Sequence, residues 1–243
     1  MAAPAAIAQA WESLLVLEGR VARNRARGNA KTSMAESGIL AVMRLPEGDG
    51  ELVQIMDAAL ADAARRAGEW LVCRSGCTQC CYGAFAIGPL DALRLGAGMD
   101  ALRGAKPDLA AEIERRARAW IAEYGPDFPG DAQAGLLGES DEDIAQFEEF
   151  ANEAACPALD LATGRCDVYA WRPMTCRVFG PPVGVDAGAE DGEALGHCEL
   201  CFVGASTAEV AGCEMPVPHE LEARLLAELG QKGETVVAFA LVR

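Results

Sequence analysis

Aromatic side chains are scarce in this sequence and make up only 6% of its 243 residues. A core of this chain must therefore be built mainly from Ala, Leu and Val, and small, closely packed side chains of this kind favour helices. Long apolar runs are also missing, since the longest stretches fall far below the roughly 18 residues that a membrane-spanning helix needs. We therefore expect a soluble protein with no membrane partner.

Positive charge is in short supply as well. The chain has 21 Lys and Arg against 37 Asp and Glu, which gives a formal net charge of −16. A field of this sign repels polyanions, so we expect no nucleic acid partner. The same surface charge suits docking to a basic protein, which makes a protein redox partner possible. The sequence does not indicate an oligomeric state.

Histidine is rare, with two residues, whereas cysteine is abundant, with ten. The first 15 residues lack a basic segment and carry Glu12 inside the apolar stretch, which argues against an export signal and favours a cytoplasmic location. A reducing compartment disfavours disulfides and favours metal thiolates or redox chemistry. The cysteines are therefore the most informative residues of the sequence.

Apolar spacing and capping residues predict a mainly α protein. The expected helices cover residues 5–26, 51–71, 90–95, 107–124, the segment from Ser140 toward Cys156, and 219–229. Several arginines lie near the end of the first helix. Gly88-Pro89 precedes the third helix, and Gly230 follows the last one. Residues 84–87 should be extended, 186–193 should form a solvated loop, and 235–242 could be a strand or a buried helix.

These segments suggest one globular unit in three parts. N-terminal helices over 1–72 would pack on a cysteine-rich metal-binding core over 73–215, and a C-terminal helix and tail would follow over 216–243. The expected fold class is therefore mainly α, with helices packed around a cysteine-rich centre that is built from loops and a few short strands.

The first cysteine cluster places four sulfurs within nine residues, at Cys73, Cys77, Cys80 and Cys81. Two cysteines separated by two residues on a tight turn can direct both thiolates at one ion or cluster. Cys80 and Cys81 are adjacent, and successive side chains of extended backbone point to opposite sides. We therefore expect these two to serve different centres, or one of them to pack as a small apolar side chain.

Two further sets follow along the chain. Cys156, Cys166 and Cys176 have nine residues between each successive pair, too many for a local turn, so they must converge through the fold. Cys198 and Cys201 repeat the two-residue spacing, and Cys213 follows. Ten sulfurs could fill two tetrathiolate sites with two left over, and all ten cysteines are candidate metal ligands.

The sequence resembles the YkgJ-like cysteine-cluster family, the CxxCxxCC proteins, which are described as zinc- or iron-chelating domains. Cys77, Cys80 and Cys81 match the end of the C-x2-C-x2-C-C run of that family, and the segments CPALD, GRCDVY and RPMTCR match its downstream pattern. The resemblance covers roughly residues 73–180. One departure is that three residues, not two, separate Cys73 from Cys77.

The resemblance leaves the metal open. An all-thiolate donor set with few histidines favours an iron-sulfur cluster, preferably 4Fe-4S, over zinc, which would be the alternative. One or two such clusters would serve redox transfer or sensing. Alternatively, zinc would close a scaffold that acts as an interaction module.

A third hypothesis is a cluster-assisted enzyme with an unknown substrate. Nucleotide-binding, HExxH and G-x-S-x-G motifs are absent from the sequence, and nothing identifies a catalytic residue. Arg172 and Arg177 flank Cys176 and either offset the charge of a cluster through hydrogen bonds, the interpretation we favour for Arg172, or pair with carboxylates at the surface. The sequence therefore identifies residues that can bind a metal, and no residue that acts on a substrate.

Overall fold

The computed structural model describes residues 44–185 and 194–243, and over these residues the fold is mainly α, as expected. The predicted helix over 5–26 with its arginines and the predicted loop over 186–193 lie outside the described residues. The α-helices are α2 (Asp49–Ala67), α3 (Pro89–Ala105), α4 (Pro107–Tyr124), α5 (Asp141–Glu149), α6 (Met174–Val178), α7 (Thr207–Ala211), α8 (His219–Leu229) and α9 (Val237–Ala240). None of them is long and apolar enough to cross a membrane.

The strands are short and form four antiparallel pairs among the described residues. The pairs are β1 (Ala86–Ile87) with β8 (Thr235–Val236), β2 (Gly130–Asp131) with β3 (Leu136–Leu137), β4 (Leu159–Asp160) with β5 (Arg165–Cys166), and β6 (Val183–Val185) with β7 (Ala194–Gly196). Three pairs join neighbouring segments of the chain, whereas β1 and β8 are far apart in sequence. This long-range pair fastens the C-terminal end to the segment that follows the first cysteine cluster.

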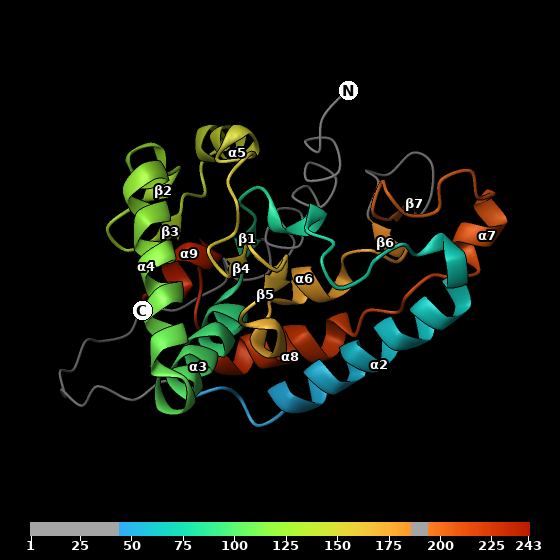
Figure 1. The fold of residues 1–243 in the computed structure, drawn as a ribbon, viewed down its shortest axis with the longest axis horizontal. Coiled ribbons are helices and arrows are strands. Elements are labelled where there is room, and N and C mark those ends of the chain that lie inside the picture. Colours follow the sequence, from blue (N-terminus) through green and yellow to red (C-terminus); the bar gives the residue numbers. More distant parts are fainter. Residues whose placement is uncertain (1–43, 186–193) are drawn as a thin grey trace, which may run out of the picture.

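Helix α2 carries the chain toward the first cysteine cluster. Leu52, Met56 and Ala63 are buried on one side of it, where they contact α6 and α8. The helix ends at Gly68, whose positive φ of 53° is readily adopted by glycine. A 3₁₀ turn, η1 (Gly68–Trp70), then leads to the cysteines. Figure 1 shows α2 and α8 side by side along one edge of the molecule.

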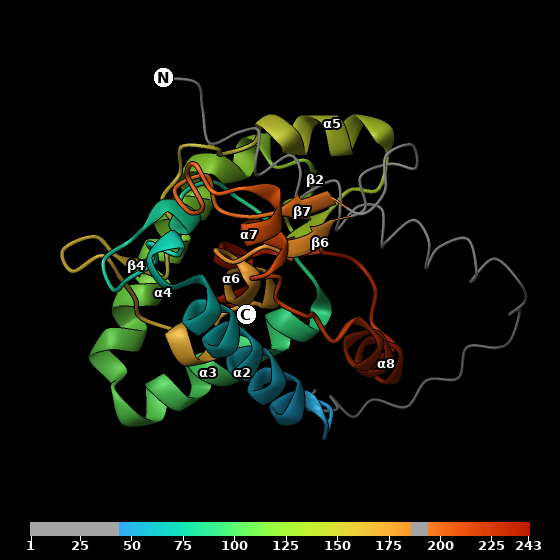
Figure 2. The same ribbon diagram turned by 90° about the vertical axis from the view of Figure 1, so that its right-hand side faces the viewer.

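A second part of the core lies between α3, α4 and α9. Their shared apolar cluster includes Leu95, Met99, Ile113 and Leu241. Ala158 and Val168, which belong to the cysteine-bearing loops, pack into the same cluster. Helix packing therefore fixes these loops directly, and Figures 1 and 2 both place α6 near the middle of the molecule.

The helix ends follow the capping signals in most places. Helix α4 spans the predicted range between Pro107 and Tyr124, and α8 ends at Gly230 in a left-handed conformation. Ser140 and Asp143 form a reciprocal capping box at the start of α5. The tail forms both predicted structures, since Thr235–Val236 is a strand and Val237–Ala240 a buried helical turn.

Candidate metal centre

The first cysteine loop is folded by two tight turns. The backbone N–H of Cys77 donates to the carbonyl of Arg74 at 2.9 Å, and that of Cys81 donates to the carbonyl of Thr78 at 2.8 Å. Gly76 lies in the first turn with a φ of 92°, a region that glycine adopts without strain. A 3₁₀ turn, η2 (Gln79–Cys81), then carries Cys80 and Cys81. The first turn therefore ends at Cys77 and the second at Cys81.

Backbone pairing brings Cys156 beside Cys81. The N–H of Cys156 donates to the carbonyl of Cys81 at 2.7 Å, and the N–H of Gly83 donates to the carbonyl of Ala154 at 2.9 Å. An isolated antiparallel bridge between Tyr82 and Ala155 lies between these bonds. The first cluster and the Cys-Pro segment are thus joined by main-chain hydrogen bonds.

Cys166 and Cys176 reach the same region from two further elements. Cys166 lies in the β4–β5 hairpin, opposite Leu159, and the tip of this hairpin touches the first cysteine loop at Gly76. Cys176 lies on α6, whose first backbone N–H, that of Met174, donates to the Asp91 carboxylate at 3.1 Å. Three cysteines with nine residues between each successive pair therefore reach the same region of the fold.

Five thiols form what we call the central thiol group: Cys80, Cys81, Cys156, Cys166 and Cys176. The pKa of each of these thiols is affected by at least one other thiol of the group, which shows that they lie near one another. All five are half-buried. The adjacent Cys80 and Cys81 belong to one group, contrary to the expectation from extended backbone. The backbone of η2 is a 3₁₀ turn and not extended, and the Cys81 thiol hydrogen-bonds to that of Cys80.

The thiols of the central group differ in acidity. The pKa of Cys80 is lowered to about 7, mainly by a hydrogen bond from the Cys81 thiol, with help from the Arg172 guanidinium. Donating that bond raises the pKa of Cys81. Burial raises the pKa of Cys156 to about 12 and that of Cys176 well above its usual value. Cys80 can therefore carry a thiolate at neutral pH, whereas a metal must displace protons from the others.

Four other thiols form the lateral thiol group: Cys73, Cys77, Cys198 and Cys201. The Sγ atoms of Cys73 and Cys201 lie 3.9 Å apart. Cys77 and Cys198 are among the charges that act on Cys73, and Cys77 and Cys201 among those that act on Cys198. Cys77 and Cys80, although only three positions apart, thus belong to different groups.

Cys213 is buried in the apolar cluster that also contains Cys198, Cys201 and Phe202. His197 places its ring against Phe202 and its Nδ1 3.1 Å from the carbonyl of Cys198. All ten cysteines are free thiols. In the described residues as they are placed, no three His, Cys, Asp or Glu side chains stand close enough together to hold a single metal ion.

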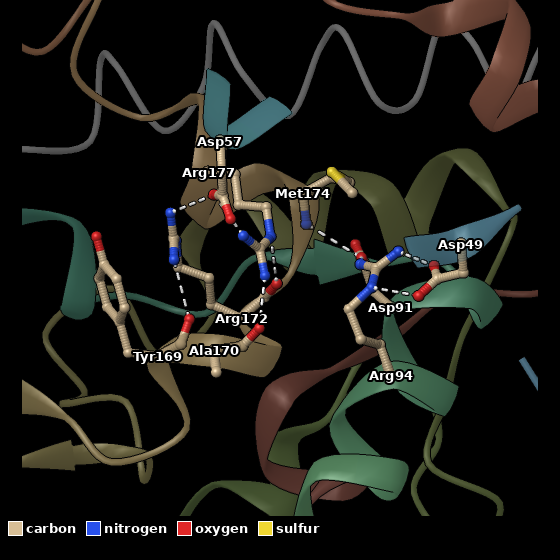
Figure 3. Close-up of polar contacts among 9 residues, drawn as sticks. All are labelled: Asp49, Asp57, Asp91, Arg94, Tyr169, Ala170, Arg172, Met174 and Arg177. Carbon is tan, nitrogen blue, oxygen red and sulfur yellow. Dashed lines mark hydrogen bonds and ion pairs between the residues drawn. The ribbon is translucent and has the colours of Figure 1, made fainter. Parts of the chain in front are cut away.

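Arg172 and Arg177 are fixed by a shared carboxylate. Arg177, fully buried, donates to Asp57 at 2.6 Å and to the carbonyls of Ala170 and Arg172. Arg172 donates to the same carboxylate at 3.1 Å, and its guanidinium lies 3.9 Å from the centre of the Tyr169 ring. Figure 3 shows both arginines converging on Asp57. The positive charge of Arg172 acts to lower the pKa of Cys80 and of Cys166. The hydrogen bonds of Arg177 instead stabilise the backbone at Ala170 and Arg172.

A comparison with known proteins identifies the segment that carries most of these cysteines. A family model named CxxCxxCC, with the description "Putative zinc- or iron-chelating domain", matches residues 72–199, which is more than half of the chain. The chain belongs to the CxxCxxCC family. No curated protein and no solved structure matches it.

The donor chemistry of this CxxCxxCC domain fits the description of its family. Both groups consist of thiols alone, and thiolates are the ligands that zinc and iron-sulfur clusters share. The central group would hold such a centre through residues from four separate segments. The protein is therefore a metal-binding cysteine-cluster protein, as the sequence predicts.

Two supporting contacts of the CxxCxxCC domain were not evident in the sequence. Arg116 on α4 donates to the carbonyl of Leu159 at 3.1 Å and pairs with Asp167, so it holds the hairpin that carries Cys166. Asp91 binds both Arg94 and the start of α6 (Figure 3). Helical periodicity marks Arg116 and Asp91 only as polar positions, because their partners are remote in sequence.

Proposed function

We propose that the central thiol group holds an iron-sulfur cluster, preferably 4Fe-4S, and that the protein transfers electrons or senses redox state through it. The observation that carries this proposal is the convergence of five thiols, with no imidazole among them, on one region. A closed zinc site and a 4Fe-4S cluster each take four ligands, and a donor set of thiols without histidine favours the cluster. A bound cluster would supply one-electron redox chemistry.

The surroundings of the group support a redox role. Iron-sulfur potentials depend on net charge and on hydrogen bonds near the sulfurs. The guanidinium of Arg172 supplies a positive charge that acts on Cys80 and Cys166. Its position is held by the Asp57 carboxylate and the Tyr169 ring. We expect this arrangement to stabilise the more negative, reduced state of a bound cluster.

Electron transfer also requires that a partner approaches the cluster. All five thiols are half-buried rather than enclosed. Tyr82, which follows Cys81, and Tyr169, which lies between Cys166 and Cys176 in sequence, are 47% and 60% exposed. With a net charge of −16, the chain favours a basic redox protein as the partner.

The test is to measure iron and acid-labile sulfide in the full chain after oxygen-free purification, together with the visible absorption. We expect about four irons and four sulfides per chain. Replacing Cys176 by Ser should remove most of both, whereas Cys213→Ser, which changes a thiol outside the central group, should retain them. Colourless wild-type protein that contains zinc at the central cysteines would overturn the proposal and favour a structural zinc module.

A further inference from the structure

Cys73 and Cys201 of the lateral thiol group belong to remote segments of the chain and meet at their sulfurs. They are 128 positions apart in sequence, and their Sγ atoms lie 3.9 Å apart. The S–S bond of a disulfide measures about 2.05 Å, so the two sulfurs must approach by roughly 1.9 Å to form one. Rotation about χ1 can move a sulfur over such a distance without moving its backbone.

The two segments are held against each other by hydrogen bonds that do not involve the sulfurs. The N–H of Phe202 donates to the carbonyl of Trp70 at 2.9 Å, and the side chain of Gln79 donates to Glu199 at 3.1 Å. These contacts flank the sulfur pair on both segments. The backbone therefore keeps the two thiols close before a bond between them forms, which lowers the entropic cost of forming it.

The two thiols differ in their access to solvent. Cys73 is exposed, whereas Cys201 is buried in an apolar cluster with Phe202. Although Cys73 is exposed, partial burial of its sulfur and the neighbouring Cys201 raise its pKa, so its reaction as a thiolate is slow. A small dissolved reagent reaches Cys73 more easily than Cys201. The exposed thiol is therefore placed to react first and the buried thiol second.

From this geometry we propose that Cys73 and Cys201 are a reversible disulfide pair, which exchanges with a low-molecular-weight disulfide. The thiolate of Cys73 attacks one sulfur of the small disulfide, forms a mixed disulfide and releases one small thiol. The thiolate of Cys201 then attacks the Cys73 sulfur and releases the second small thiol. The protein loses two electrons and the protons of its two thiols, and the small disulfide gains them.

The disulfide would fasten the start of the first cysteine loop to the 198–202 segment. Cys73 begins that loop, and Cys80 and Cys81 of the central thiol group lie at its end. A covalent bond between positions so far apart in sequence restricts the unfolded chain and thereby stabilises the folded one. The pair thus couples the stability of this loop to the redox state of the surrounding thiols, and it needs no metal ion and no cluster in the central group.

The test exposes the reduced full chain, purified without oxygen, to glutathione disulfide for several hours, then blocks free thiols and maps the cysteines by trypsin digestion and mass spectrometry. Residues 67–74 contain Cys73 as their only cysteine, and residues 178–224 contain Cys201. In the wild type we expect most of these two peptides to be joined through Cys73 and Cys201, and a reducing agent to separate them. The thermal midpoint of the oxidised protein should be higher by several degrees.

Three variants separate the two steps. Cys201→Ser should stop the reaction after the first step, so that residues 67–74 carry one glutathione and no cross-link. Cys73→Ser removes the exposed thiol and should leave residues 178–224 without that cross-link, while unchanged far-ultraviolet circular dichroism shows that the variant folds. Cys213→Ser, which alters a buried thiol of the same apolar cluster as Cys201, should form the cross-link as the wild type does.

Wild-type protein in which Cys73 stays free, or in which Cys201 is joined to Cys198 instead, would overturn the inference. A cross-link to residues 67–74 that persists in Cys201→Ser would overturn it as well. Iron and sulfide are measured in the same samples, because a wild type that lacks both and still forms the bond between Cys73 and Cys201 would overturn only the proposed cluster.

Discussion

The buried guanidinium of Arg177 donates to the carboxylate of Asp57 at 2.6 Å, which ties α6 to α2 immediately beside Cys176. Asp57 also binds Arg172, so one carboxylate balances two cations (Figure 3). The scaffold under the central thiol group therefore depends on a charge network as well as on apolar packing. Several of its contacts can be tested by single substitutions.

Replacing Asp57 by Asn should lower the free energy of unfolding by about 1.5–3 kcal/mol, the range for hydrogen bonds to charged groups. The loss arises because Arg177 is fully buried and would keep its charge without a carboxylate partner. Urea unfolding measures the change. Asp62→Asn is a matched control, because Asp62 lies on the same helix, is about as exposed as Asp57 and also pairs with two arginines, but its partners Arg65 and Arg66 are exposed where Arg177 is buried. Its effect should stay below about 1 kcal/mol. Equal losses in both variants would contradict this account.

Arg94 neutralises two buried carboxylates, Asp49 and Asp91. Arg94→Met should destabilise the fold by about 3–5 kcal/mol, because both acids would remain buried without a cation. Arg103 on the same helix pairs with Asp100 and Glu114 near the surface, and Arg103→Met should cost less than about 1 kcal/mol. Thermal or urea unfolding of the two variants compares them directly, and an Arg94 variant as stable as the Arg103 variant would refute the prediction.

The pH dependence of that loss has a definite sign. Burial raises the pKa of Asp91 in the folded protein, while Arg94 opposes the rise. Without Arg94 the folded-state pKa should rise further above the unfolded value, so protonation on acidification favours the folded state. The difference in unfolding free energy between the wild type and Arg94→Met should therefore be smaller at pH 5 than at pH 7.5. A difference that grows on acidification would show that Asp91 is not the group responsible.

Gly98 gives room to Trp171, since an added Cβ would lie 2.5 Å from the indole. Gly98→Ala should destabilise the protein by about 1–3 kcal/mol through overpacking, despite the better helix propensity of Ala. Gly96, two residues earlier on α3, has nothing within 4 Å of an added Cβ. Gly96→Ala should therefore stabilise the helix by up to about 1 kcal/mol. Denaturation midpoints of the two variants should move in opposite directions.

The charge of Arg172 should set the potential of a cluster in the central group. Arg172→Gln is expected to lower the reduction potential by on the order of tens of millivolts, because the reduced state loses a nearby positive charge. Arg165→Gln is the control, because Arg165 precedes Cys166 in sequence but is exposed. Anaerobic redox titration followed by absorption measures both. An equal shift of the reduction potential in the two variants would contradict this prediction, because it would show that the potential depends on the net charge of the protein and not on the position of Arg172.

Local signals in the sequence predicted α2, α4, α5 and α8, whereas α3 runs to Ala105, well past the predicted 90–95, and α6 and α7 were not predicted. Pro107 starts α4 because its ring fixes φ, and Gly230 ends α8 because glycine readily adopts the left-handed conformation found there. Helix α5 ends at Glu149, earlier than expected, and Ala151 then takes a positive φ of 53° that its residue type does not suggest. Apolar packing of Phe147 and Phe150 in an aromatic cluster accompanies this end.

The spacing of the cysteines indicated that they are candidate metal ligands. It did not indicate which of them belong to the central and which to the lateral thiol group. This division depends on contacts between remote segments, such as the hydrogen bond from Phe202 to Trp70 and that from Cys156 to Cys81. The adjacency of Cys80 and Cys81 suggested different centres, and the 3₁₀ geometry of η2 reverses this. Arg177 matched a sequence motif, yet its hydrogen bonds go to Asp57 and to backbone carbonyls.

Iron K-edge X-ray absorption of the full chain, purified without oxygen, tests the central claim most directly. We predict that the iron is surrounded by sulfur and has other iron atoms as near neighbours, and that Cys176→Ser loses this signal. Iron bound by nitrogen and oxygen alone, or protein that retains no iron while zinc occupies the central thiol group, would contradict the account.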